Sequence, residues 1–396
     1  MSRKPKLNFT LYLPALLIDF ALSSVLTNSA FYTSDLKLSS TFLGLLMAIA
    51  LTHFTFLAIP FGKLSDRVNR KNMLYTGCFL LAVVSIGLRF CSNKYHLLLL
   101  FPGIGISMAL FWPAYEAWLA EREDEGKLLH RVMLFNLFWS IGVTLGPAIS
   151  GYLYQDINPY RPFYLACVSG LLTLCVIFVQ KSGSTSTDFI TDNTHERTEI
   201  LFPSTSVRKT YLNLGRCANF ASWFTLGVLR RLAPKLTMET GILPTTFGNY
   251  MLALGGVQTI TFLFLGTGYS TRWHYRFTPL LITQILAILC FIGIWKVQHT
   301  LFWICAFALI GVSVAFSYFS SLYYGLHMQL DKGNKSGWHE AILGIGSLLG
   351  PLLGGIAADS ILGPQSPYLL CAVVILFAIG LEIFIISKNW MSADAL

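Results

Sequence analysis

Charge is what this sequence has least of. Of its 396 residues, 12% are charged and 54% are hydrophobic, whereas soluble domains carry about 25% charged residues. A soluble protein with so little charge would expose large apolar patches and aggregate, so this class is excluded. The apolar residues also fall in continuous runs instead of alternating along the chain, which excludes a transmembrane β-barrel. The composition therefore predicts an all-α membrane protein that crosses the bilayer many times.

Paired cysteine motifs are also missing. The eight Cys are scattered without a C-x-x-C, and all but one lie well inside apolar runs, where Cys behaves as a small hydrophobe. No motif gathers His, Cys, Asp or Glu at one membrane face as a catalytic or metal centre would require. We therefore expect no metal, no cofactor and no enzymatic activity, with a membrane-embedded enzyme kept as one alternative.

Twelve apolar runs are long enough to span a bilayer, which takes about 20 residues. No small-residue cleavage site follows the first run, so we expect it to be retained as a membrane helix. Residues 182–210 are rich in Ser, Thr and charge and predict a cytoplasmic linker between an N-terminal bundle (1–181) and a C-terminal bundle (211–396). The predicted helices are 10–31, 41–61, 73–92, 96–119, 131–153, 161–181, 211–232, 244–268, 278–296, 300–326, 339–361 and 367–387.

The 28 Lys and Arg are distributed unevenly among the loops. Most lie in the N-terminal tail, the even-numbered loops, the linker and the C-terminal tail, which predicts that these segments and both termini are cytoplasmic. Arg230, Arg231 and Lys235 run against this pattern, because the predicted helix 211–232 puts them outside. The net positive charge is thus explained by topology in a plasma or bacterial inner membrane, and no nucleic-acid partner is expected.

Glycine and proline residues of the first half of the chain recur in the second half. Every matched pair is separated by the same number of residues, which we call the repeat offset. One offset that holds from the second helix to the fifth predicts two six-helix halves of the same fold. The matched pairs are Gly44 with Gly248, Gly62 with Gly266, Gly142 with Gly346, Gly146 with Gly350, Pro147 with Pro351 and Gly151 with Gly355.

The stretch 62–71 is a short charged break between two apolar runs and reads GKLSDRVNRK. It resembles the signature G-x-L-a-D-r-x-G-r-k that the major facilitator superfamily carries between its second and third helices, with Asn69 where the family has Gly. Together with the repeat, the resemblance covers nearly the whole chain. It implies the major facilitator fold, twelve transmembrane helices in two pseudo-symmetric six-helix bundles, and a secondary active transporter that moves a small organic solute by alternating access.

The resemblance also implies a conformational latch in this stretch, which in the family is thought to steady the outward-facing state. Asp66 is expected to lie on the cytoplasmic side against the N-terminus of the helix that begins near His339, where the helix dipole is positive. The alternative is an ion pair of little energetic weight. The predicted latch residues are Gly62, Asp66, Arg67, Arg70 and Lys71.

Polar side chains at membrane depth are candidates for coupling and substrate binding, because burying them is costly. Asp19 lies roughly 14 Å into the first helix, near the midplane, and His53 lies at comparable depth in the second. The two form a candidate proton-responsive pair; otherwise Asp19 is a structural acid and His53 a packed core residue. Further candidates either line the same cavity or pack elsewhere in the membrane, namely Trp112, Tyr115, Glu116, Trp139, Trp223 and Tyr318.

Small residues at four-residue spacing mark the fifth and eleventh helices and allow close helix packing, and a proline bends each helix. The pattern partly resembles the fifth-helix glycine motif of the superfamily's drug antiporters, but its recurrence in the second half favours a packing seam between the two bundles. This interdomain seam is expected to contain Gly142, Gly146, Pro147, Gly151, Gly346, Gly350, Pro351 and Gly355.

An aromatic cavity with one acid favours an amphipathic or cationic organic substrate over a sugar phosphate, which needs more Arg or Lys at depth. The expected activity is efflux of such a compound in exchange for protons, by a monomer in the lipid bilayer. Many proton-coupled relatives carry an Arg four residues before a G-x-G in the fourth helix, where this chain has Leu99. Coupling through Asp19 and facilitated diffusion therefore both stay open. The alternatives are a uniporter, a nutrient importer and a non-transporting scaffold or receptor.

Overall fold

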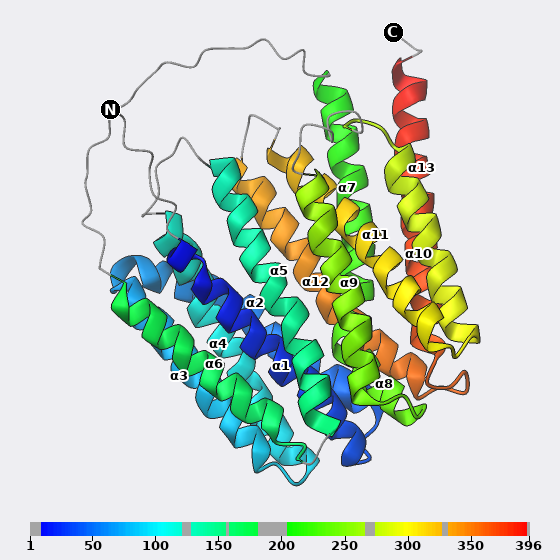
Figure 1. Cartoon of the computed structure of the whole chain (residues 1–396). Coiled ribbons are helices and arrows are strands. Elements are labelled where there is room, and N and C mark those ends of the chain that lie inside the picture. The colour runs from blue at the N-terminus through cyan, green and yellow to red at the C-terminus, as the bar shows by residue number, and fades with distance from the viewer. Residues whose placement is uncertain are drawn as a thin grey trace.

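The computed structural model describes residues 9–120, 128–155, 158–180, 204–265, 274–326 and 332–393. Within these ranges every regular element is a helix (Figure 1). The elements are η1 (Phe9–Leu11), α1 (Leu13–Asp35), α2 (Ser40–Arg67), α3 (Arg70–Arg89), α4 (Lys94–Ala120), α5 (Leu128–Gln155), α6 (Arg161–Val179), α7 (Thr205–Gly227), η3 (Val228–Leu232), α8 (Ala233–Glu239), α9 (Pro244–Leu265), α10 (Thr278–Lys296), α11 (Thr300–Leu326), α12 (Lys332–Ala358) and α13 (Ser366–Ala393).

Eleven helices in the described ranges are long and apolar enough to cross a membrane, and each coincides with a predicted run. The remaining run, 211–232, lies in a continuous helical stretch formed by α7, η3 and α8. This stretch holds six Lys and Arg between residues 205 and 239, which makes it more polar than the other eleven. The chain is therefore an integral, multi-pass membrane protein.

Serine side chains set the beginnings of two helices. Ser39 accepts a hydrogen bond from the Phe42 N–H at 3.1 Å and caps α2, and Ser204 accepts one from the Val207 N–H at 3.4 Å and caps α7. Such caps satisfy backbone donors that the first helical turn leaves unpaired. The predicted linker 182–210 lies outside the described residues up to position 203, and its final residues belong to α7.

The charged stretch 62–71 is mostly helical instead of a loop. α2 continues to Arg67, and only Val68 and Asn69 separate it from α3. Asn69 has φ −61° and ψ 119°, and its side chain accepts a hydrogen bond from the Lys71 N–H at 3.0 Å. Asn69 is therefore the N-cap of α3, a role that uses a side-chain oxygen which the family's Gly does not have.

The helices pack as two groups. In the first group, α1 packs on α5 and α6, α2 packs on α4, and α3 packs on α4 and α6. In the second group, α7 packs on α11, α12 and α13, α9 packs on α11, and α10 packs on α11 and α13. The groups meet mainly through α2 against α12 and α5 against α9. Figure 1 shows the blue-to-green helices α1–α6 on one side and the yellow-to-red helices α9–α13 on the other.

Contacts inside the two groups are equivalent at the repeat offset found in the sequence. A Cβ on Gly142 of α5 would lie 2.3 Å from the Leu16 oxygen of α1. A Cβ on Gly346 of α12 would lie 2.8 Å from the Phe220 oxygen of α7, and the repeat offset also relates Leu16 to Phe220. These glycines therefore bring α5 onto α1 and α12 onto α7, within each group, whereas we expected them between the bundles. The glycines one turn further along face the same two helices, namely Gly146 and Gly350.

The same offset relates contacts between the groups. A Cβ on Gly151 would lie 2.2 Å from the Pro244 oxygen at the start of α9. A Cβ on Gly355 would lie 2.4 Å from the Ser40 oxygen at the start of α2, and the repeat offset also relates Ser40 to Pro244. Side chains larger than Gly would push the groups apart at both places. Of the predicted seam residues, Gly151, Pro351 and Gly355 make contacts between the groups, and Pro147 lines a cavity between them.

These contacts between the groups gather at the end of the molecule where α2 and α9 begin. There the Tyr152 hydroxyl donates to Asn249 Oδ1 at 2.6 Å, and the buried Lys235 ammonium donates to Ser40 Oγ at 3.1 Å. The opposite end, where α2 stops and α3 begins, is the Arg67 end. We call the first region the closed end, at the bottom of Figure 1, and it comprises residues 40–44, 148–152, 235, 244–249 and 351–359.

Candidate functional site

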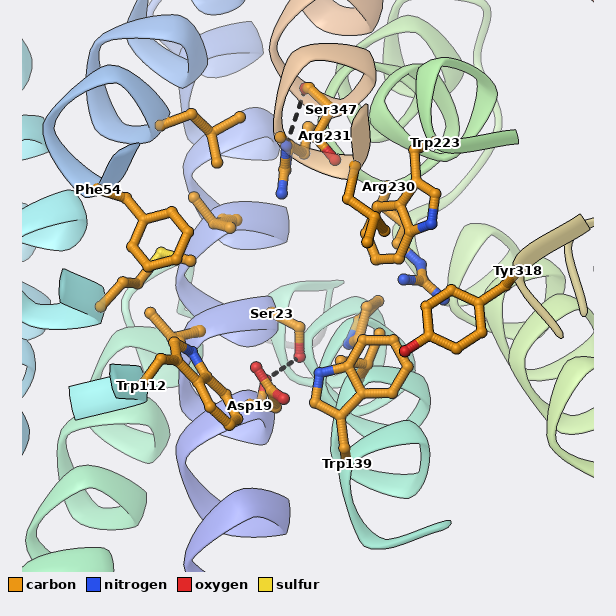
Figure 2. Close-up of a pocket in the computed structure, with 18 of the residues that line it drawn as sticks. Asp19, Ser23, Phe54, Trp112, Trp139, Trp223, Arg230, Arg231, Tyr318 and Ser347 are labelled. Carbon is orange, nitrogen blue, oxygen red and sulfur yellow. Dashed lines mark hydrogen bonds between the residues drawn. The ribbon is translucent and has the colours of Figure 1, made fainter. Parts of the chain in front are cut away.

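A cavity of about 250 Å³ lies between the two helix groups (Figure 2). Its wall comes from α1, α2, α4 and α5 of the first group and from α7, η3, α11 and α12 of the second. The charged and amide side chains in the wall are Asp19, Glu116, Asn136, Arg230 and Arg231. The aromatic side chains in the wall are Phe54, Trp112, Phe135, Trp139, Trp223 and Tyr318.

Asp19 of α1 lies in this wall and is only 7% exposed. The Trp139 indole N–H donates to its carboxylate, and the two side chains face each other in Figure 2. The positive charge of Arg230 acts on the carboxylate from the other helix group. Within the described residues, its second oxygen, Oδ2, has no hydrogen-bond partner. A buried carboxylate is stable only when its charge is compensated, and Arg230 supplies a compensating charge here.

Arg230 and Arg231 lie on η3, a turn of π-helix between α7 and α8, and both line the cavity. Arg230 Nη2 donates to Gln258 Oε1 at 2.9 Å. Arg231 Nη1 donates to the Ser347 backbone oxygen at 2.9 Å, as the dashed line in Figure 2 shows. π-helical turns within α-helices occur frequently at functional sites. The cavity contains the guanidinium groups of both residues, whereas we expected these arginines outside, at the end of the predicted helix 211–232.

The apolar run 211–232 ends at these two arginines, which is why we expected them outside the membrane. The helix instead continues through α8 to Glu239. The internal repeat is the signal that finds them. At the repeat offset Arg231 corresponds to Thr27, which lies on the face of Asp19 and lines the same cavity.

Aromatic rings from both groups form opposing parts of the wall. The ring centroids of Trp139 and Trp223 are 6.4 Å apart, and those of Trp223 and Tyr318 are 6.3 Å apart. On the other side, Trp112 meets Phe135 edge to face at 6.1 Å. The Trp223 indole N–H is buried and has no hydrogen-bond partner among the described residues. The rings offer flat apolar surface to a bound solute.

Two of the predicted cavity residues do not line the cavity. His53 Nδ1 pairs with the Ile49 backbone oxygen at 2.8 Å in the preceding turn of its own helix. Tyr115 is fully buried, and its hydroxyl donates to the Leu11 oxygen at 2.7 Å. The expected Asp19–His53 pair is therefore not formed. The predicted residues that do line the cavity are Asp19, Trp112, Glu116, Trp139, Trp223 and Tyr318.

The predicted latch residues form local bonds at the Arg67 end. Asp66 and Arg70 make an ion pair at 2.9 Å, with the Asp66 side chain 64% exposed. Arg70 also donates to Ser65 Oγ at 3.0 Å, and the Lys71 ammonium donates to the Gln180 backbone oxygen. An exposed pair of this kind contributes about 1 kcal/mol or less. The Arg70 bonds hold α3 to α2, and the Lys71 bond holds α3 to the end of α6, all within the first group.

The proposed partner of Asp66 is the start of α12, which the structure places at Lys332, about two turns before the expected start at His339. Side chains 332–338 lie outside the described residues. Gly62 packs within the first group, where its Cβ would lie 3.4 Å from Pro113. A latch between the groups through Gly62, Asp66 and Arg67 stays a prediction.

Residues 10–330 match the sequence model of the family described as the Major Facilitator Superfamily. The chain belongs to this superfamily. The superfamily assignment agrees with the resemblance carried by stretch 62–71, and it places the chain among membrane transporters.

This superfamily member is 24% identical to the quinolone resistance protein NorA of Staphylococcus aureus (strain MSSA476) over 363 residues, 89% of each chain. It is 36% identical to the uncharacterized MFS-type transporter MJ1317 of Methanocaldococcus jannaschii over 126 residues, 30% of this chain and 31% of that protein. A bacterial homolog of the human lysosomal transporter Spinster, in its inward-facing, unoccupied conformation, has a TM-score of 0.76 at 16% identity over 99% of both chains. At that identity the likeness concerns the fold.

Proposed function

We propose that the protein is a secondary active transporter whose two helix groups are pseudo-symmetric six-helix domains that alternate access to the central cavity. The domains would be 1–181 and 211–396, joined by the linker 182–210. The observation that carries this proposal is the equivalence of contacts at the repeat offset, within the groups and between them. It supports two copies of one bundle that are joined at the closed end.

The distribution of Lys and Arg orients this arrangement. With both termini in the cytoplasm, the closed end faces outward and the Arg67 end faces the cytoplasm. The cavity is then reached from the cytoplasm, and the conformation is inward-facing. The latch at Asp66 is expected to engage only in the outward-facing state, in which the Arg67 end closes, which accounts for its local pairing with Arg70 here.

Asp19 is the group through which protons would act on transport. It is a buried carboxylate of the cavity on which Arg230 acts, and one of its oxygens has no hydrogen-bond partner in the described part of the chain. Export of a small organic solute is the expected direction, supported by the relation to NorA, a protein named for quinolone resistance. Uniport without protons is the alternative if Asp19 has only a structural role.

Import by proton cotransport is a second candidate, and the position of Arg230 favours it. A proton on Asp19 would release Arg230 from its attraction to the carboxylate and leave the guanidinium available to an anionic solute. Proton and anion would then favour each other's binding. Proteoliposomes with a pH gradient of either sign separate the two directions, because export and import respond to opposite gradients.

Alternating access is tested by labelling a thiol in the cavity from each side of the membrane. Asn136→Cys lines the cavity and is introduced after the eight native Cys are replaced. We expect a membrane-impermeant maleimide to label it from both sides of the membrane. With Tyr152→Cys and Asn249→Cys joined across the closed end by a bifunctional thiol reagent, labelling should persist only from the cytoplasmic side. Labelling from one side in both variants would count against alternation and would favour the scaffold.

A further inference from the structure

We propose that the cavity binds an organic anion, with the carboxylate of the solute at Arg231 and its apolar or aromatic body against the ring wall. This rests on the proposed function in that the cavity is taken as the transport site. It specifies the chemistry of the substrate, and it replaces the expected cation.

The two arginines lack sufficient compensating charge of their own. The hydrogen bonds that Arg230 and Arg231 make within the described residues go to neutral acceptors, a Gln258 amide oxygen and a Ser347 backbone oxygen. The two positive charges repel each other, and of the two it is Arg230 that is opposed by Asp19. An arginine carries five N–H donors, so each guanidinium keeps donors for a further ligand.

A carboxylate is the ligand that fits this arrangement. The planar guanidinium fork binds carboxylates through paired charge-assisted hydrogen bonds. At Arg231 no acid of the described part of the chain competes for it. At Arg230 the competitor is Asp19, which already receives the Trp139 indole N–H. A cationic solute would meet the positive charge of Arg231 and, at Asp19, an acid whose charge Arg230 already opposes. The other acid of the wall, Glu116, is exposed.

The remainder of the wall defines the body of the solute. Trp139, Trp223 and Tyr318 lie in succession beside Arg230 in Figure 2, and Trp112 lies across the cavity. Flat apolar groups stack on such rings. A sugar phosphate would leave most of its hydroxyl groups facing aromatic carbon, which is unfavourable. The structure therefore favours an aromatic or apolar carboxylic acid.

The proposal is tested with solutes that share a ring and differ only in the head group. Purified protein in nanodiscs is titrated calorimetrically with 2-naphthylacetate, its amide 2-naphthylacetamide and the amine 2-(2-naphthyl)ethylamine, and then with the corresponding phenyl compounds. Empty nanodiscs correct for partition into lipid. We expect the acids to bind at least about tenfold more tightly than the amides and amines.

Variants assign the binding to the arginines. Arg231→Gln should weaken binding of the acid by about tenfold to a hundredfold, the range expected for a charge-assisted hydrogen bond, while leaving the amide unchanged. Arg231→Lys keeps the positive charge but not the planar guanidinium fork, so it should weaken binding of the acid less than Arg231→Gln does. Lys209→Gln removes a positive charge from an exposed position of α7, in the same continuous helical stretch as η3, and should leave binding of the acid unchanged. Size-exclusion profiles show which variants are folded.

Several results would overturn the anion site. They are preferential binding of the amine or amide, equal loss of acid binding in Arg231→Gln and Lys209→Gln, and no binding of either acid at millimolar concentration. The labelling experiment at Asn136 needs no ligand, so its outcome judges the transport proposal separately. If the labelling shows alternation but the amine binds preferentially, the transport proposal stands and the substrate is a cation.

Discussion

The Asp359 carboxylate accepts a hydrogen bond from the Thr41 backbone N–H at 2.6 Å, and a second from the Ser40 N–H at 3.0 Å. Asp359 directly follows α12 in the second helix group, whereas Ser40 and Thr41 begin α2 in the first. One group thus supplies a second capping side chain to a helix of the other, in addition to the N-cap Ser39. The bond exists only while the closed end stays closed, so it stabilises the conformation described here.

Removing this cap should open the closed end. Loss of an N-cap costs about 1 kcal/mol, so Asp359→Ala should lower the ratio of closed to open molecules by about fivefold. Spin labels at Tyr95→Cys and Leu362→Cys report the distance between the two groups at the closed end, where both positions are exposed. Ser360→Ala is the matched control, because its hydroxyl bonds to the Ala357 oxygen within its own group. An unchanged distance distribution in Asp359→Ala would show that the cap does not hold the end.

The same bond predicts how closure depends on pH. Partial burial raises the pKa of Asp359. Hydrogen bonds from Thr41 and Ser40 and the charge of Lys235 together outweigh this effect, so the pKa lies below its ordinary value. A carboxyl whose pKa is lowered in the closed state stabilises that state above the ordinary pKa, and the stabilisation is lost as the pH falls through the lowered value. The contribution of Asp359 to the closed fraction should therefore be constant from about pH 8 to about pH 5 and fall below about pH 4. Asp359→Asn should abolish this fall, and a transition near neutral pH that survives in Asp359→Asn would assign it to another group.

Glycine at the closed end is expected to be essential for closure. In Gly355→Ala the new Cβ would lie 2.4 Å from the Ser40 backbone oxygen, and backbone cannot yield as a flexible side chain can. Overpacking of this kind destabilises by about 1–3 kcal/mol, here at the expense of the closed conformation. The Tyr95–Leu362 label distance should lengthen. Gly380→Ala of α13, where a Cβ would meet nothing within 4 Å, should leave it as in the unmodified chain; equal effects of the two substitutions would point to a general loss of stability.

Neutralising Asp19 distinguishes an anionic substrate from a cationic one. Asp19→Asn removes the competitor for Arg230, so binding of 2-naphthylacetate should tighten severalfold in the calorimetric titration. Flux of this acid in proteoliposomes should at the same time lose its response to a pH gradient. Asp35→Asn, a change to an acid that binds Tyr154 at the closed end, should not tighten binding. If Asp19→Asn instead weakens binding of 2-naphthylacetate and tightens binding of no other tested solute, Asp19 is a structural support of the cavity.

The positions of the helices followed from the sequence, because an apolar run of sufficient length has few alternatives to a membrane span. The boundaries differed where caps decide them, as at Ser204, and where a charged stretch remains helical, as between Gly62 and Arg67. Asp19 was found because a lone acid in an apolar helix stands out. Most of the aromatic candidates were found because they cluster near the middle of their helices.

The arginines of the cavity were missed for a physical reason. Hydropathy ends a predicted span at consecutive charges, although a cavity between helices can accommodate them. Arg230 and Arg231 lie in such a cavity, on a π-helical turn that no local propensity signals. Gly142 and Gly346 were assigned to the wrong interface because four-residue spacing indicates close packing without indicating which helix packs there.

The central claim is that the two helix groups move against each other about the cavity, and paired distances test it most directly. In nanodiscs, the Tyr95–Leu362 label pair reports the closed end, and labels at Leu64→Cys and Val207→Cys, exposed positions on α2 and α7, report the Arg67 end. The account predicts that Asp359→Ala and Gly355→Ala lengthen the first distance and shorten the second. Two distances that stay fixed, or that lengthen together, would contradict it.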